Sequence, residues 1–405
     1  MTTRTRAASQ NLAVKSSSRR QTLETALTAA LAAVDPEPLT RDALRGHSGP
    51  VTLVAIGKGA AAMCRGAVLA MGAVTGICVT SHESQVPDGV ELMLGDHPIP
   101  GARSFLAGRR VLEAVAESRH PIVALLSGGG SSLCEQPVEG VSVDLIREAT
   151  SALLEAGASI EDINLVRRHL STIKGGGLTR VATAPLDTYA ISDVCGADPS
   201  VIASGPTSPQ PRDHEAALAI MSTHGIRVSE DARMAISKAS GPAPAGPAIT
   251  VLADGRTAAK AAADATGAAG VDASVMPEWL HGDAARALDR FFSSAAPGRV
   301  TIATGEPEVE VTGDGIGGRN THVALMAAER IAGTGATFCA FATDGVDGNS
   351  HAAGAIVGGD TLERGGDHRE ALARSDSANY LESTGDLIVT GPTGTNVSDL
   401  WLLWR

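Results

Sequence analysis

The sequence predicts an α/β protein of two domains, with a mostly parallel sheet covered by helices on both faces in the first domain and a mixed sheet in the second. Its 405 residues exceed what one ordinary hydrophobic core organises. Short apolar runs alternate with helical stretches along the first half, as in sheets whose parallel strands are connected by helices. The composition, with 43% hydrophobic and 19% charged residues, is that of a folded globular protein.

The first half of the chain alternates between expected helices and strands. Residues 1–18 look frayed and are expected to be flexible, whereas an amphipathic helix is expected to start near Arg19 and to end at Pro36. Buried strands are expected at 51–56, 76–80, 121–126 and 187–194. Helical stretches lie between these strands, which favours parallel pairing.

A segment rich in Pro, Gly and Ala at 240–248 marks the expected domain boundary. It divides the chain into a first domain at 19–240 and a second at 241–405. Further strands are expected at 248–253, at 299–313 as a hairpin, at 337–343 and at 386–391. The hairpin predicts that the second sheet is mixed.

Charge and cysteine usage exclude several classes of protein. A net charge of -12 argues against a nucleic-acid surface, which needs a basic domain. No stretch reaches the ~18 apolar residues that span a bilayer, and residues 1–20 lack the apolar segment of a signal peptide. Five scattered cysteines without a CxxC pair indicate free thiols in a reducing compartment. We therefore expect a cytoplasmic protein without nucleic-acid or membrane partners.

Two glycine-rich loops directly follow expected strands. In GKGA (57–60), Gly57 and Gly59 would let the backbone approach a phosphate, and Lys58 would add a positive charge; a tight turn with a solvated lysine is the alternative. In SGGGSS (127–132), successive backbone N–H groups would form an anion-binding nest. The expected phosphate-binding residues of this second loop are Ser127, Gly128, Gly129, Gly130, Ser131 and Ser132.

Acidic residues also stand at or just beyond strand ends. Asp193 and Asp198 follow one strand, and Asp344 and Asp347 follow another. Carboxylates there can hold Mg²⁺ or accept a hydroxyl proton. For any single one of them, a helix cap or an Asx turn is the alternative.

Two further cations lie beside glycines. Arg319 opens an expected helix after the loop 313–320, where its planar fork suits a carboxylate or a phosphate. Lys174 precedes three glycines. The chain contains neither a GxxxxGK[ST] loop nor the HRD and DFG motifs of protein kinases.

Taken together, these motifs resemble the glycerate 2-kinase family, whose second half is the MOFRL domain. They run in the family's order over nearly the whole chain: AIGKGA, GDHPIPG, LLSGGGSSL, INLVRRHLSTIKGGGL, ISDVCGADPSVIASGPTSP, GGRN, TDGVDG and GPTGTNVSDL. The resemblance implies a Rossmann-like first domain, a second α/β domain and an active site in the cleft between them. It implies ATP and Mg²⁺, transfer to the 2-hydroxyl of D-glycerate, and Lys58 and Arg319 as cleft residues.

The chain departs from the family pattern at several positions. Thr321 and His322 stand where Gln and Glu are usual, Gly177 stands where Arg is common, and Gly255 stands where Asn is common. These departures leave a related acceptor open, such as a four-carbon aldonate (erythronate or threonate). A homodimer is compatible with the sequence.

We expect in-line transfer in which SGGGSS and Lys174 bind the nucleotide phosphates. One or more of Asp193, Asp344 and Asp347 are the expected metal ligands, and Lys58 and Arg319 would neutralise charge. An aspartate would accept the hydroxyl proton; Asp193 is a candidate for this catalytic role, and the sequence leaves open which aspartate is the base and which holds the metal.

Two other functions remain open. One is an NAD(P)-dependent hydroxypyruvate reductase, based on the GxGxxA pattern at 57–62 and on Glu83 as the ribose ligand. The other is a non-catalytic sensor.

Overall fold

The computed structural model describes residues 3–194, 198–238 and 246–405, and the chain divides into two compact units. The first unit is Asp35–Leu252, and the second joins Met1–Val34 to Ala253–Arg405. The expected boundary at 240–248 lies largely outside the described residues. The strand expected to open the second domain, β6 (Ile249–Ala253), instead completes the first sheet, so the chain changes unit after that strand.

The first unit contains a six-stranded sheet in the order β3-β2-β1-β4-β5-β6. Its other strands are β1 (Thr52–Ile56), β2 (Thr75–Thr80), β3 (Val90–Leu94), β4 (Ile122–Leu126) and β5 (Leu186–Ile191). The pairings from β3 through β5 are parallel. The strand order reverses between β1 and β4, and such a switch point leaves a ligand crevice at the carboxyl ends of the two strands.

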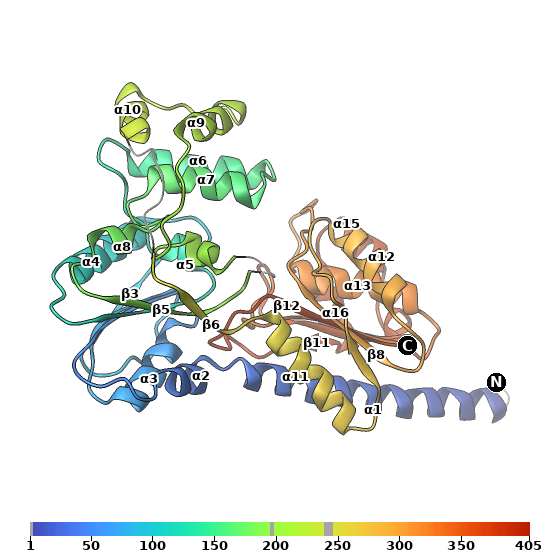
Figure 1. Ribbon diagram of the computed structural model, residues 1–405. Coiled ribbons are helices and arrows are strands. Elements are labelled where there is room, and N and C mark those ends of the chain that lie inside the picture. Colours follow the sequence, from blue (N-terminus) through green and yellow to red (C-terminus); the bar gives the residue numbers. More distant parts are fainter. Residues whose placement is uncertain (1–2, 195–197, 239–245) are drawn as a thin grey trace. The chain divides into compact units, whose positions relative to one another are not determined.

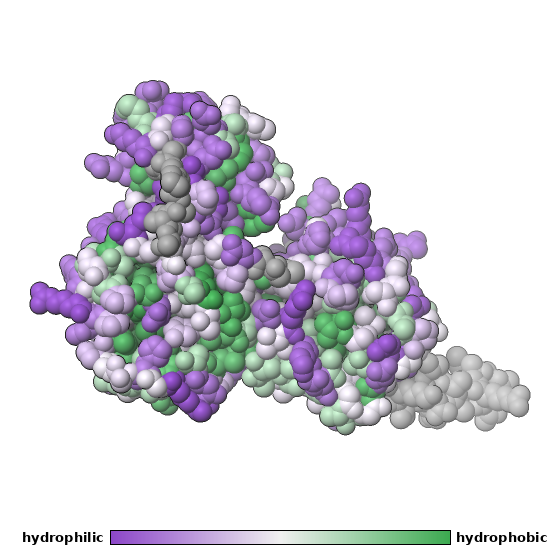
Figure 2. Space-filling model, in the orientation of Figure 1, coloured by the Kyte–Doolittle hydropathy of each residue, from purple (hydrophilic) through white to green (hydrophobic). Residues whose placement is uncertain are grey.

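Helices cover both faces of this sheet, as expected. In Figure 1, α3 (Ala60–Met71) lies on one face and α4 (Ala102–Ala116) on the other. A separate helical layer has its own apolar core, which includes Leu145, Leu153, Val166 and Met221. It consists of α6 (Val143–Glu155), α7 (Ile160–Leu170), α9 (His214–Thr223) and α10 (Glu230–Lys238). Hydrophilic residues gather on the outer side of α9 and α10 (Figure 2).

Shorter elements complete the first unit. They are α2 (Pro36–Ala43), α5 (Gly130–Leu133), α8 (Gly177–Val181) and the 3₁₀ helix η1 (Pro199–Ser204).

The second unit contains a mixed sheet in the order β11-β10-β9-β12-β8-β7, which confirms the expected sheet type. Its strands are β7 (Ala273–Val275), β8 (Val300–Gly305), β9 (Thr337–Ala342), β10 (Gly354–Gly358), β11 (Leu387–Ile388) and β12 (Asp399–Trp404). Only β7 and β8 pair in parallel among these described strands. The hairpin expected at 299–313 is wrong: beyond β8 the described chain makes one isolated bridge, at Glu308, and Val311 is exposed.

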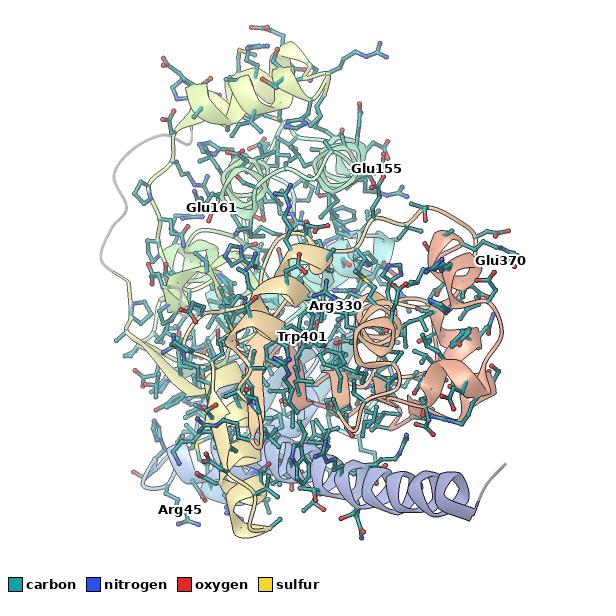
Figure 3. All side chains as sticks on the ribbon, turned by 90° about the vertical axis from the view of Figure 1, so that its right-hand side faces the viewer. Arg45, Glu155, Glu161, Arg330, Glu370 and Trp401 are labelled. Atoms are coloured by element: carbon teal, nitrogen blue, oxygen red, sulfur yellow. The ribbon has the colours of Figure 1, made fainter. Side chains whose placement is uncertain are left out.

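Helices also cover both faces of the second sheet (Figure 1). One face carries α12 (Ala284–Ser294), α13 (Arg319–Ile331), α14 (Thr361–Arg364), α15 (His368–Ala373) and α16 (Ser377–Thr384). The other carries α11 (Gly255–Ala268) and α1, which runs from Thr3 to Ala33 and so begins well before Arg19. Trp401, labelled in Figure 3, lies in the core with its ring edge-to-face with Phe291 and Phe338 at 5.8 and 6.0 Å.

No helix in the described part of the chain is long and apolar enough to cross a membrane.

Candidate active site

The two glycine-rich loops meet at the switch point of the first sheet. GKGA follows β1, and SGGGSS follows the neighbouring strand β4. The Lys58 N–H donates to the Gly128 carbonyl at 2.9 Å, and the Gly59 N–H donates to Ser127 Oγ at 2.9 Å. The fold therefore joins both loops in the crevice where an α/β sheet of this order binds its ligand.

The backbone of GKGA is fully used within the protein. Besides the two bonds above, the Gly57 N–H donates to the Val79 carbonyl at 3.0 Å and the Ala60 N–H to the Gly57 carbonyl at 3.2 Å. A Cβ atom on Gly57 would lie 2.2 Å from Ser127 Oγ, so glycine is needed for loop packing. This corrects the expectation that Gly57 opens the backbone to a phosphate, because the amides of this loop are already donated.

The backbone of SGGGSS is different. Within the described residues, no acceptor receives a hydrogen bond from the N–H groups of Gly128, Gly129, Gly130 and Ser131. Gly129 adopts φ +80°, and the Lys58 side chain passes beside it, with Cγ 3.2 Å from the position of a Cβ atom. Four successive unmatched donors next to a lysine are suited to an anion.

Sequence reasoning missed a polar cluster beside this loop. Ser131 Oγ lies 2.6 Å from Ser204 Oγ and accepts a hydrogen bond from Arg167 Nη1 at 3.1 Å, and Ser204 in turn donates to Asn164 Oδ1 at 2.8 Å. Burial lowers the pKa of Arg167, although Glu135 opposes this. Arg167 is thus a guanidinium held against the loop. The motif INLVRRHL contains it, but the motif does not show which arginine turns inward.

The backbone next to Ser204 is strained. Ala203 and Ser204 have φ of 52° and 61°, in the left-handed region, where a non-glycine residue costs about 1–3 kcal/mol. A Cβ atom on Gly130 would lie 2.8 Å from the Ala203 Cβ. This strained segment therefore packs directly on SGGGSS and fixes its shape.

Lys174 is placed differently from the expectation. Its side chain is 1% exposed and its ammonium group pairs with the Glu135 carboxylate, which is 2% exposed. Ser171 Oγ donates to the other Glu135 oxygen. Lys174 therefore stabilises the interior under the loop and does not present its charge to a nucleotide.

In the second unit, Arg319 opens α13 and binds Asp399 with both arms of its fork. Nε lies 2.6 Å from Asp399 Oδ2, Nη2 lies 3.1 Å from Oδ1, and Nη2 also pairs with Glu306 at 2.8 Å. Burial raises the pKa of Asp399 to about 6, although the Arg319 charge opposes that rise. For Arg319, burial lowers the pKa, but the two carboxylates outweigh it and the guanidinium stays charged.

Asp347 caps the start of α13. Its carboxylate accepts from the Asn320 N–H at 2.9 Å, and from the Thr321 N–H and Oγ1 at 2.8 Å each. The side chain is 2% exposed. Burial raises its pKa, while these hydrogen bonds oppose the shift. Asp347 is thus occupied as a helix cap, the alternative noted above, which weighs against its expected role as a metal ligand.

The remaining aspartates follow strands. Asp193 is half-buried just beyond β5, the neighbour of β4. Asp344 Oδ1 accepts from the Val346 N–H at 3.1 Å, as in an Asx turn. Asp198 caps η1 by accepting from the Ser200 N–H at 2.9 Å. Across the described residues, no three His, Cys, Asp or Glu side chains are grouped to hold a metal ion.

Two of the departures from the family pattern, Thr321 and Gly177, have local reasons. Thr321 is fully buried and closes the α13 cap, because its Oγ1 also accepts from the Gly318 N–H at 2.9 Å. His322, next along α13, is half-buried, and burial lowers its pKa. A Cβ atom on Gly177 would lie 1.9 Å from the Thr172 carbonyl oxygen, so this backbone has no room for a side chain there.

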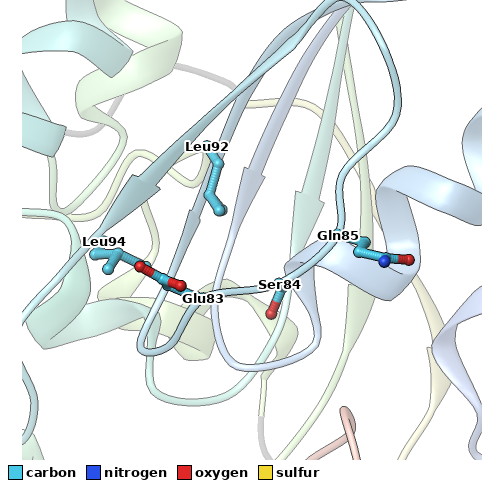
Figure 4. Close-up of a pocket in the computed structure, with 5 residues that line it drawn as sticks. All are labelled: Glu83, Ser84, Gln85, Leu92 and Leu94. Carbon is cyan, nitrogen blue, oxygen red and sulfur yellow. The ribbon is translucent and has the colours of Figure 1, made fainter.

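A pocket of about 500 Å³ opens beside the edge strand β3 (Figure 4). It is lined by Glu83, Ser84, Gln85, Leu92 and Leu94. This lining includes a carboxylate and no cation, so it is unsuited to a phosphate. It lies between the segment after β2 and one face of β3.

Comparison with known proteins agrees with this arrangement. Residues 22–237 match the family described as a domain of unknown function (DUF4147), and residues 299–399 match the MOFRL family. The D-glycerate 2-kinase of Thermotoga maritima is 39% identical over 86% of this chain and 89% of its own length. The glycerate 2-kinase of Pyrococcus horikoshii is 34% identical over 87% and 86%.

A further relative and a solved structure are also similar to this chain. An Agrobacterium vitis protein with the provisional name of a hydroxypyruvate reductase is 38% identical over 95% of this chain and 94% of its own. The crystal structure of a Thermotoga maritima glycerate kinase matches with a TM-score of 0.85 at 35% identity, over 96% of this chain and 99% of that one. The fold, the order of the motifs and these relatives agree, and the chain belongs to the glycerate 2-kinase family.

Proposed function

We propose that this protein transfers the terminal phosphoryl group of ATP to the 2-hydroxyl of D-glycerate. The observation that carries the proposal is the row of four unmatched N–H donors in SGGGSS at the switch point of the first sheet. A triphosphate satisfies such donors, whereas GKGA, the other candidate loop, has none to offer. Cytoplasmic location and a homodimer stay predictions.

Three cations share the charge of the reacting groups in this proposal. Lys58 lies along Gly129, and Arg167 is held against Ser131, so both flank the donors of SGGGSS. For Arg319, whose guanidinium pairs with Asp399 and Glu306 within the second unit, a role in binding the carboxylate of the acceptor rests on the family resemblance. Phosphoryl transfer depends mainly on positioning and charge neutralisation, so loss of one such cation lowers the rate by ~10³-fold.

A half-buried carboxylate just beyond β5, the neighbour of β4, is the candidate for holding Mg²⁺. This ion commonly takes one or two protein carboxylates, with phosphate oxygens and water completing its shell, so a cluster of three acids is not required. Asp193 would hold it, with Asp344 as a second candidate. When bound, the ion withdraws charge from the phosphates.

The reaction forms one bond and breaks another. The 2-hydroxyl oxygen of the acceptor attacks the terminal phosphorus of ATP, and the bond from that phosphorus to the bridging oxygen of ADP breaks. The hydroxyl proton passes to whichever of Asp193 and Asp344 does not hold the ion. Exclusion of water from the site protects the phosphoryl group from hydrolysis.

The test is ADP release from purified protein with ATP, Mg²⁺ and a panel of acids: D-glycerate, L-glycerate, erythronate, threonate and hydroxypyruvate. We expect turnover with D-glycerate, at least 10³-fold lower in Lys58→Ala and Arg319→Ala. The exposed Lys260, paired with Asp264 at 2.6 Å, provides Lys260→Ala as a control with unchanged turnover. ADP release with a four-carbon acid alone would show that this acid, and not D-glycerate, is the acceptor. No ADP release with any acid would overturn the proposed kinase activity.

The reductase is a weaker candidate, favoured by the Agrobacterium vitis relative. A dinucleotide fold of this type places the pyrophosphate on the amides after β1. Those amides, in GKGA, are all donated to protein acceptors. Oxidation of NADH in the presence of hydroxypyruvate would support the reductase function.

A further inference from the structure

Three arginines of the first unit converge on the glycine loop 171–177. Arg180 Nη1, from α8, donates to the Gly175 carbonyl at 2.6 Å. Arg212, from the segment before α9, donates from Nη2 to the Ser171 carbonyl at 3.4 Å. Arg168, in the last turn of α7, lies with Cδ 3.0 Å from the position of a Cβ atom on Gly175. One short loop thus contacts three arginine side chains that come from separate elements.

These arginines have no counter-ion in the described part of the chain. The ion pairs there include none made by Arg168, Arg180 or Arg212. Each is anchored through a neutral acceptor, which for Arg168 is the amide oxygen of Gln210. Like charges gathered without an acid repel one another, and burial together with Arg180 and Arg168 lowers the pKa of Arg212 to about 10.

Some of their donors are also unmatched. The Nε atoms of Arg168 and Arg212 are buried, and no acceptor reaches them within the described residues. A buried donor without a partner costs about 1–3 kcal/mol. Repulsion and unmatched donors at one place are both relieved by a multivalent anion.

The arginine loop is connected to SGGGSS. The Gly175 N–H donates to the Ser204 carbonyl at 3.1 Å and the Gly176 N–H to the Gly205 carbonyl at 2.7 Å. Ser204 Oγ contacts Ser131 Oγ at 2.6 Å. An anion bound by the arginines would therefore act on the shape of SGGGSS through Ser204.

We infer that Arg168, Arg180 and Arg212 form a second anion site, which binds a phosphate group. Guanidinium forks match phosphate oxygens two at a time, and three of them offer enough charge for a dianion. The group is either free phosphate or part of a nucleotide or a phosphorylated acid. The inference goes beyond the proposed function, because that reaction uses the donors of SGGGSS.

The test is calorimetric titration of the full chain with inorganic phosphate. We expect Arg180→Gln and Arg212→Gln to remove one phosphate from the binding stoichiometry, or to weaken its Kd at least tenfold. Arg110→Gln is the matched control, since Arg110 of the same unit is on the surface and pairs with Glu91 at 2.8 Å. If Arg212→Gln destabilises the protein, as shown by a lower melting temperature, the comparison uses Arg180→Gln, because Arg180 is exposed.

Parallel titrations separate the sources of the phosphate. Weaker ATP binding in both variants, with unchanged 2-phosphoglycerate binding, identifies the nucleotide as the source. Weaker 2-phosphoglycerate binding with unchanged ATP binding identifies the phosphorylated acid. Weaker binding of inorganic phosphate alone identifies a free anion. Phosphate binding that is the same in wild type and both variants, or missing from the wild type, overturns the site. Inorganic phosphate needs no turnover, so failure of the kinase assay would leave this result standing.

Discussion

At the scale of single residues, Lys174 and Glu135 form the most deeply buried ion pair among the described residues of the first unit. Lys174→Met removes the ammonium group that pairs with the buried Glu135 carboxylate, so we expect a loss of about 3–5 kcal/mol in the free energy of unfolding, measured with urea. Lys174→Met with Glu135→Gln removes both charges and should recover most of that loss. A double variant as unstable as the single one would contradict the pairing.

His169 gives a second residue-scale prediction, for pH. Burial lowers its pKa, and the charges of Arg212, Arg168 and His214 lower it further. Below pH ~6.5, the ordinary histidine pKa, the unfolded chain therefore binds more protons than the folded chain. The free energy of unfolding thus falls as the pH falls from ~6.5 toward the lowered pKa of folded His169. We expect His169→Gln to reduce the drop in melting temperature between pH 7.5 and 5.5. The exposed His120 supplies the control His120→Gln, and equal slopes in the two variants would rule out His169 as the cause.

At the scale of elements, a glycine-to-alanine substitution, which adds one methyl group, tests how the loops GKGA and SGGGSS pack together. Gly57 (φ +133°) has Ser127 Oγ 2.2 Å from its Cβ position, whereas Gly72 (φ +82°) has nothing within 4 Å. Gly72→Ala should cost only backbone strain, about 1–3 kcal/mol. Gly57→Ala should cost more and weaken ATP binding at least tenfold in a calorimetric titration, because it pushes SGGGSS aside. Equal effects of the two variants would show that the loops do not depend on this contact.

The elements that the sequence predicts best are the fully buried ones. Strands β1, β2 and β4 appear as short apolar runs because both of their faces are covered. The edge strand β3 has half-exposed side chains and no such run. The residues after β8 alternate as a strand would, yet they have no partner that buries Val311.

At the scale of the whole molecule, sequence reasoning found two α/β domains but not how the chain is shared between them. The amphipathic face of α1, with Leu23, Ala26 and Ala30, predicts burial. It does not reveal the partners, α11 and β9, which lie more than 200 residues later. For the same reason the sequence does not indicate that β6, which follows the expected boundary, belongs to the first sheet.

The candidate site was predictable in position more than in detail. Loops that follow β1 and β4 must meet if those strands are neighbours, so SGGGSS and Lys58 could be placed together. Whether an amide is free depends on acceptors elsewhere in the chain, such as the Val79 carbonyl that takes the Gly57 N–H. The burial of Lys174 against Glu135 and the cap formed by Asp347 likewise depend on distant partners.

Phosphoryl transfer to D-glycerate is tested by ³¹P NMR of the product formed from ATP, Mg²⁺ and D-glycerate. We expect a phosphomonoester on carbon 2 with ADP in equal amount, and we expect Lys58→Ala to form both at no more than ~0.1% of the wild-type rate. A phosphate on carbon 3 would contradict the proposed acceptor geometry. Unchanged ATP, in a protein that still binds the nucleotide, would contradict phosphoryl transfer itself.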